Sequence, residues 1–263
     1  MMVVSDGAIL PIGGTIDNTG TIAVGSTGAE TDLEILVRGA TLTGGGHLTL
    51  SDDSANVVFG GDPSAVLTNV DNIISGAGQL GGGSLTLDNE AGGVIDADGA
   101  NALVIDTGAN VFSNTGTVRA SGAGGLIVES AMTGGGKAEI GAGSSIEFAV
   151  ASDARVNFDA SAGGTLKLDQ AGGFSGTVAG FTGYDAIDLA DLVDGQAMTL
   201  GYAANADGTG GTLTLSDGTH IASLALLGQY AAADFATAAD PNGGTLVTLA
   251  DPTQNHALIA PGA

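Results

Sequence analysis

The feature that most constrains the fold is a repeated phrase, in which a run of glycines precedes a short stretch of alternating apolar and polar residues. The clearest copies are residues 44–52 (GGGHLTLSD) and 81–89 (GGGSLTLDN), and weaker copies begin at residues 134, 163, 210 and 243. Alternation with period two is typical of a half-buried strand, and glycine supplies the backbone conformations of tight turns. The sequence therefore predicts many short strands separated by turns.

Composition distinguishes among the all-β architectures. Hydrophobic residues make up 43% of the chain, yet aromatic residues make up only 4%, and 47 of the 263 residues are glycine. Small aliphatic side chains suit the narrow core of stacked coils, whereas a sandwich or a barrel usually holds more aromatic side chains. The irregular spacing of the phrase fits a solenoid, because insertions loop out from its faces. We predict an all-β fold, a right-handed parallel β-solenoid (β-helix).

Two regions are expected along the chain. Residues 1–170 are predicted to form the solenoid, and residues 171–263 a small β-rich C-terminal capping or secretion-linked module. A cap is expected because a bare solenoid end leaves strand edges unpaired. Helical spacing is nearly absent; residues 222–235 fit either a short helix or a strand followed by a turn.

Residues 114–136 contain NTGTVRA, then GGLIV and GGG, and resemble the β-strand repeats of large secreted bacterial surface proteins. These proteins include autotransporter passengers and filamentous-haemagglutinin-like adhesins. Residues 174–189 (FSGTVAGFTGYDAIDL) and 243–249 (GGTLVTL) are similar to the C-terminal modules of type I-secreted proteins of this kind. The resemblance implies export, a secreted or cell-surface location, and a structural or adhesive role. The partners it implies are a host or matrix surface, a glycan or further copies of the chain.

Charge excludes several partner classes. The chain has 29 acidic and 5 basic residues, a net charge of −24. Such a surface repels nucleic acid and anionic membranes, and no apolar run approaches the roughly 18 residues of a membrane span. We therefore expect neither a nucleic-acid partner nor membrane insertion. Residues 1–6 lack the basic and hydrophobic regions of a signal peptide, so we expect either that the chain is a fragment or that its export signal lies elsewhere.

Two groups of aspartates are candidate calcium ligands, and calcium is the only cofactor that the sequence suggests. Asp185, Asp188 and Asp191 are spaced by three residues, and oxygen-rich clusters suit Ca²⁺. Asp96 and Asp98 begin an Asp-x-Asp-Gly sequence that lacks the acidic residue closing a calcium loop. The competing interpretations are a solvated polar edge for the first group and an Asp-Gly turn between coils for the second.

Motifs of catalysis are missing, so we predict that the chain is not an enzyme. It has no Gly-x-Ser-x-Gly elbow, phosphate loop or dinucleotide fingerprint, and no cysteine or tryptophan. The histidines, expected in turns or on the surface, and the basic residues are scattered one by one. Two alternatives stay open: a filament or surface-layer subunit built by solenoid stacking, and a polysaccharide-active β-helix enzyme with a carboxylate pair.

Overall fold

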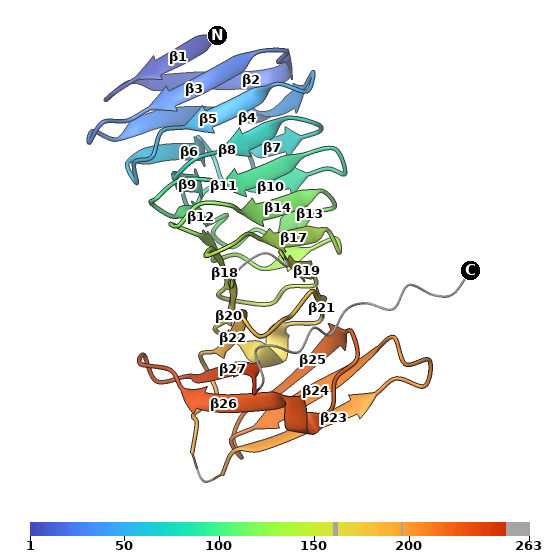
Figure 1. Cartoon of the computed structure of the whole chain (residues 1–263). Helices are drawn as coiled ribbons and strands as arrows, with labels where there is room; N and C mark the ends of the chain where they lie inside the picture. Colours follow the sequence, from blue (N-terminus) through green and yellow to red (C-terminus); the bar gives the residue numbers. More distant parts are fainter. Residues whose placement is uncertain (160–162, 196, 251–263) are drawn as a thin grey trace.

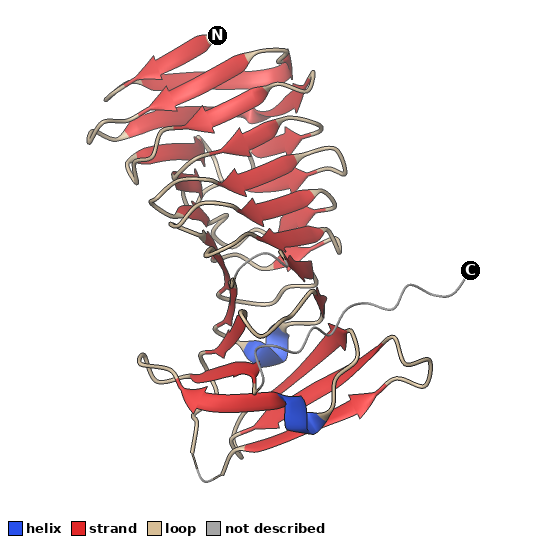
Figure 2. Ribbon diagram, in the orientation of Figure 1, coloured by secondary structure: helices blue, strands red, loops and turns tan. Residues whose placement is uncertain are grey.

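Short strands form where apolar and polar residues alternate, and they stack as parallel coils. The computed structural model describes residues 1–159, 163–195 and 197–250. Figure 1 shows the coils following one another from the N-terminus to a splayed C-terminal unit, and Figure 2 shows that strands dominate throughout. The predicted all-β, right-handed parallel β-solenoid with a small C-terminal β cap is confirmed. No helix in the described ranges has the length and apolar character needed to cross a membrane.

A full coil has three faces, of which the first is one continuous parallel sheet. Its strands begin 18 to 26 residues apart, so the turns absorb the uneven repeat length. In order along the sheet they are β1 (Met2–Ser5), β3 (Thr21–Gly25), β5 (His47–Leu50), β8 (Ile73–Ser75), β11 (Val94–Ala97), β14 (Thr117–Ala120), β17 (Lys137–Ile140), β19 (Arg155–Phe158) and β21 (Thr177–Ala179).

The second and third faces are joined because β2 (Ile9–Asp17) and β4 (Thr31–Thr43) run through both. The second face continues through β6 (Asn56–Gly60), β9 (Gly78–Gly81), β12 (Leu103–Ile105), β15 (Leu126–Val128), β18 (Ser145–Phe148), β20 (Thr165–Leu168) and β22 (Ala186–Leu189). The third face is shorter and consists of β7 (Val66–Asn69), β10 (Thr86–Asn89), β13 (Phe112–Asn114) and β16 (Met132–Thr133). Single bridges extend it from Met132 to Ser152 and from Ser152 to Phe174.

Inward-pointing side chains form ladders of stacked aliphatic residues. On the first face each member of one such ladder is at most 2% exposed. Burying a side chain of this kind contributes about 1.5–3 kcal/mol for the larger members, and every coil repeats the gain. The ladder runs, in register, through Ile22, Leu48, Ile74, Ile95, Val118, Ala138, Val156, Val178 and Leu226.

A ladder of buried asparagines lies at the corner between the third and first faces. Asn69, Asn89 and Asn114 end successive strands in register and are fully buried. The Nδ2 of Asn69 donates to Oδ1 of Asn89 at 2.9 Å, and the Nδ2 of Asn89 donates to Oδ1 of Asn114 at 2.8 Å. Stacked amides of this kind satisfy one another's polar groups from coil to coil. The asparagines therefore hold the corner of the coil in one conformation.

The cap extends both main sheets with antiparallel strands. β25 (Ile221–Leu227) pairs in parallel with β21, and then antiparallel with β24 (Gly210–Ser216), which pairs with β23 (Thr199–Ala204). β27 (Thr245–Leu249) pairs antiparallel with both β22 and β26 (Phe235–Ala239). Two short 3₁₀ turns, η1 (Ala171–Gly173) and η2 (Ala232–Asp234), complete the elements. Residues 222–235 thus form a strand and a turn rather than a helix.

Aromatic rings fill the base of the rod. Tyr202, Tyr230 and Phe235 form a three-membered cluster in which every pair of ring centroids is 5.4 to 6.0 Å apart. The hydroxyl of Tyr230 donates to the carbonyl of Phe181 at 2.9 Å, which ties this cluster to the last coil. Phe181 in turn contacts Phe158 at a centroid distance of 5.7 Å. The cap therefore covers the C-terminal end of the aliphatic core.

Parallel pairing continues past residue 170, the boundary expected from the sequence. β21 and β22 pair in parallel with β19 and β20, so residues 177–189 belong to the stack of coils. Neither strand follows a long glycine run, which is why the sequence pattern does not mark them. Their apolar residues nevertheless fit the ladders: Val178 aligns with Val156.

The asparagine ladder gives the first prediction. Replacing Asn89 with alanine removes its bonds to Asn69 and Asn114 and leaves buried amide groups without partners. We expect a loss of about 2–4 kcal/mol in the free energy of unfolding, measured by chemical denaturation. The control Asn157→Ala changes an exposed asparagine on β19 and should cost less than about 0.5 kcal/mol. Equal stability of Asn89→Ala and the parent protein would contradict a structural role for the ladder.

Candidate functional site

Asp185, the first candidate calcium ligand, anchors a turn. Its side chain is buried, and Oδ1 accepts a hydrogen bond from the amide of Gly164 at 3.0 Å. Oδ2 accepts from both the amide and the hydroxyl of Thr182, each at 2.8 Å. Backbone donors thus occupy both oxygens, as is usual for a carboxylate that fixes a turn.

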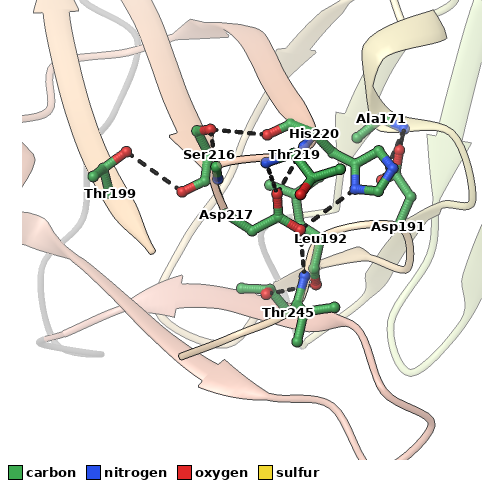
Figure 3. Close-up of polar contacts among 11 residues, drawn as sticks. Ala171, Asp191, Leu192, Thr199, Ser216, Asp217, Thr219, His220 and Thr245 are labelled. Carbon is green, nitrogen blue, oxygen red and sulfur yellow. Dashed lines mark hydrogen bonds and ion pairs between the residues drawn. The ribbon is translucent and has the colours of Figure 1, made fainter. Parts of the chain in front are cut away.

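Asp191 is also engaged by the backbone, but at a different place. Both of its carboxylate oxygens accept from the amide of Ala171 at 3.2 Å, and this contact holds η1 against the chain that follows β22 (Figure 3). Asp217, not singled out by the sequence, fixes a neighbouring turn by accepting from the amides of Thr219 and His220, both at 2.7 Å. These backbone hydrogen bonds, with a third from Val193, lower the pKa of Asp217 far below its ordinary value.

Asp188 belongs to an ionic ladder on the second face. Glu147, Lys167 and Asp188 occupy one outward position on β18, β20 and β22. The ammonium group of Lys167 lies 3.0 Å from Oε1 of Glu147 and 3.0 Å from Oδ1 of Asp169. Asp188 is buried, and its Oδ1 has no hydrogen-bond partner within the described chain. Burial raises the pKa of Asp188, and the negative charge of Asp240 raises it further. The surroundings of Asp188 thus disfavour its charge.

Asp96 and Asp98, the second candidate pair, separate. Asp96 is buried on β11, where it forms an ion pair with Arg119 and accepts from the hydroxyl of Ser121 at 2.8 Å. Asp98 is exposed in the bend between β11 and β12. The pair therefore lies at a turn between coils, with one carboxylate directed to a neighbouring coil and the other to solvent.

The structure does not bring the candidate calcium ligands together. In the three described stretches, no group of three or more His, Asp or Glu side chains has the arrangement needed to hold a metal ion. His47 is exposed at the start of β5, His220 lies in the turn before β25, and His256 falls outside the described residues. Calcium binding stays a prediction from the sequence, and the geometry offers it no shared site.

The arrangement that sequence reasoning missed is cationic. Arg119, Lys137 and Arg155 are separated along the chain, but they lie on β14, β17 and β19, which are adjacent strands of the first face. The register places Lys137 directly beside Arg155. These residues are separated by about one coil, and this spacing could have indicated that they lie on adjacent strands. The coil length varies by several residues along the rod, so the sequence alone does not show which residues align.

Comparison with models of protein families, with curated proteins and with solved structures finds no match to this chain.

The raised pKa of Asp188 predicts a pH-dependent effect on stability. Because folding disfavours its ionised form, the charge destabilises the native state above the raised pKa, and this cost disappears once the carboxyl is protonated in both states. Asp188→Asn should therefore raise the melting temperature at pH 7 by about 1–4 °C. The gain should shrink to zero as the pH falls below the ordinary aspartate value near 3.8.

The matched control is Asp98→Asn, which removes an exposed carboxylate and should leave the melting temperature unchanged at both pH values. A lower melting temperature for Asp188→Asn at pH 7 would show that the charge of Asp188 is favourable in the folded state. A gain independent of pH would show that the stabilisation does not come from removing the charge.

Proposed function

We propose that the chain is a non-enzymatic structural or adhesive segment of an exported bacterial surface protein. The observation that carries this proposal is the continuous stack of parallel coils, whose interior is filled by aliphatic ladders and whose outward positions are free to vary. A rod of this kind presents an extended, rigid face at a fixed distance from its base. The resemblance of residues 114–136 to the repeats of autotransporter passengers and filamentous-haemagglutinin-like adhesins supports the same role.

The hydrogen bonds and ion pair of three candidate carboxylates support a role without catalysis. Asp185 and Asp191 accept hydrogen bonds from backbone amides, and Asp96 is paired with Arg119. A glycosidase requires two carboxyl groups facing one substrate, one of them protonated and free to donate. Asp188 has a raised pKa, but Lys167 stands between it and Glu147 in the ladder.

A surface location predicts that an epitope tag inserted at Gly208 will be detected by antibody on intact cells of the native bacterium. Gly208 lies at an exposed turn of the β23–β24 hairpin, where a Cβ would meet no other atom within 4 Å, so an insertion should leave the fold intact. Signal on intact cells should equal the signal after permeabilisation, while a tagged cytoplasmic protein should be stained only after permeabilisation. Staining confined to permeabilised cells would refute export.

Self-association is a second candidate, favoured by exposed apolar side chains of the first described coil. Within the described residues no strand covers the outer edge of β1, and Met1, Met2, Val3 and Ile9 of this first coil are exposed apolar side chains. An uncovered edge of this kind readily pairs with another strand. Because the cap covers the opposite end, contact between two copies through their first coils would close as a two-fold dimer rather than propagate as a filament.

End-to-end pairing predicts a dimer in sedimentation experiments at high protein concentration. Val3→Lys places two positive charges opposite each other at the proposed contact and should leave the protein monomeric. The control Val37→Lys changes an equally exposed valine on β4, away from the end, and should leave the dimer intact. A monomer at every concentration, or filaments that grow without limit, would exclude this mode of association.

A further inference from the structure

A groove of about 340 Å³ lies on the first face, where β17, β19 and β21 of the rod meet β25 of the cap. Figure 1 shows these strands in succession along the lower part of the rod. The volume falls within the range of about 300–1,000 Å³ that is usual for ligand sites. The groove is lined, among others, by Lys137, Glu139, Arg155, Asn157, Thr177 and Leu227.

Two of the five basic residues of the chain stand side by side in this groove. Lys137 and Arg155 are direct neighbours in register, and both are exposed. Within the described chain neither forms an ion pair, although the protein has 29 acidic residues. The carboxylate of Asp153, two residues before Arg155, accepts hydrogen bonds from the amides of Gly134 and Gly135 at 3.1 and 3.0 Å.

Of the other three cations two are in ion pairs, whereas Arg38 forms none within the described residues and donates to the carbonyl of Gly13 at 3.2 Å. Arg119 is paired with Asp96, and Lys167 with Glu147 and Asp169. Like charges placed directly opposite each other on neighbouring strands destabilise a sheet. The unpaired Lys137–Arg155 neighbours are therefore a local cost to stability, and an anion held between them would remove it.

We propose that this groove binds a carboxylate-bearing polysaccharide, through the carboxylate of an acidic sugar held between Lys137 and Arg155. The planar guanidinium of Arg155 matches a carboxylate with two parallel hydrogen bonds, while the ammonium of Lys137 adds a compact second charge. The inference names the ligand class for the adhesive role and thus rests on the proposed function.

The other polar groups of the groove suit the hydroxyls of a sugar. The amide of Asn157 and the hydroxyl of Thr177 both donate and accept, and the carboxylate of Glu139 accepts. A site for a small inorganic anion has no use for an acceptor-only carboxylate beside its cations. A sugar acid, which carries one anion and several hydroxyl donors, uses all of these groups at once. The combination therefore favours a saccharide over a free anion.

The overall charge of −24 does not prevent this contact at physiological salt. Exposed charges separated by more than about 8 Å are largely screened there, whereas the cations in the groove would touch the ligand directly. Binding is for this reason measured at physiological ionic strength.

The test is calorimetric titration of the full chain with trigalacturonic acid. The double variant Lys137→Ala/Arg155→Ala should weaken binding at least tenfold, and Lys137→Gln/Arg155→Gln, which retains more side-chain bulk, should do the same. Both sites are exposed and the two charges repel each other, so the melting temperatures should equal or slightly exceed that of the parent protein. The control Arg38→Ala removes an exposed cation from the second coil and should leave the affinity unchanged.

Two comparison ligands test the assignment of the ligand class. A neutral trisaccharide of the same length should not bind, and an acidic peptide or a sulfated trisaccharide of equal charge should bind at least tenfold more weakly. Equal affinity for either charged ligand would overturn the assignment to a carboxylated sugar. Unchanged binding in the double variants, or no binding of trigalacturonic acid at millimolar concentration, would overturn the site itself. Neither result depends on export, so a failure here is distinguishable from a failure of surface staining.

Discussion

In-register parallel pairing of each coil with the next is the constraint on which the rest of the structure depends. It places residues one coil apart directly above one another, so the aliphatic positions that point inward in one coil are continued by buried side chains in the next. The same contact leaves no room for side chains at some turns: a Cβ on Gly76 would lie 1.9 Å from the carbonyl oxygen of Leu50 in the preceding coil. The glycine content and the aliphatic composition are both consequences of this close stacking.

Much of this architecture is predictable from the sequence, because the alternation of apolar and polar residues follows strand geometry locally. The phrases at residues 44–52 and 81–89 predict short half-buried strands, and their low aromatic content predicts a narrow core. The limits of the stack are less predictable. β21 and β22 also belong to the stack. Their only sequence signal is their apolar residues, because neither strand follows the long glycine run that marks the clearest copies. Their position is determined by pairing with strands of the preceding coil. A local sequence pattern does not reveal that pairing.

The candidate sites were harder to predict, for a physical reason that their residues show. A spacing of three suggests that Asp185, Asp188 and Asp191 share a face, as they would on a helix. They instead belong to a strand and its flanking turns, where successive side chains point in different directions. The proximity of Lys137 and Arg155 depends on the length of one particular coil, and coil length varies along the rod. Clusters of side chains in a solenoid are therefore set by register rather than by local spacing.

The two kinds of ladder on the first face show where function can be encoded in such a fold. The inward ladder that contains Ile95 and Val118 consists of aliphatic residues. A change of side-chain volume at one of its positions would alter the packing of the coils on both sides. One residue earlier along each strand, the outward ladder carries hydroxyl, aliphatic and basic side chains: Thr21, His47, Ile73, Val94, Thr117, Lys137, Arg155 and Thr177. Outward positions can thus change without disturbing the core, so a pair of unpaired cations in one of them reflects neither packing nor folding. The binding role that we propose for this pair would account for charges that the fold itself does not require.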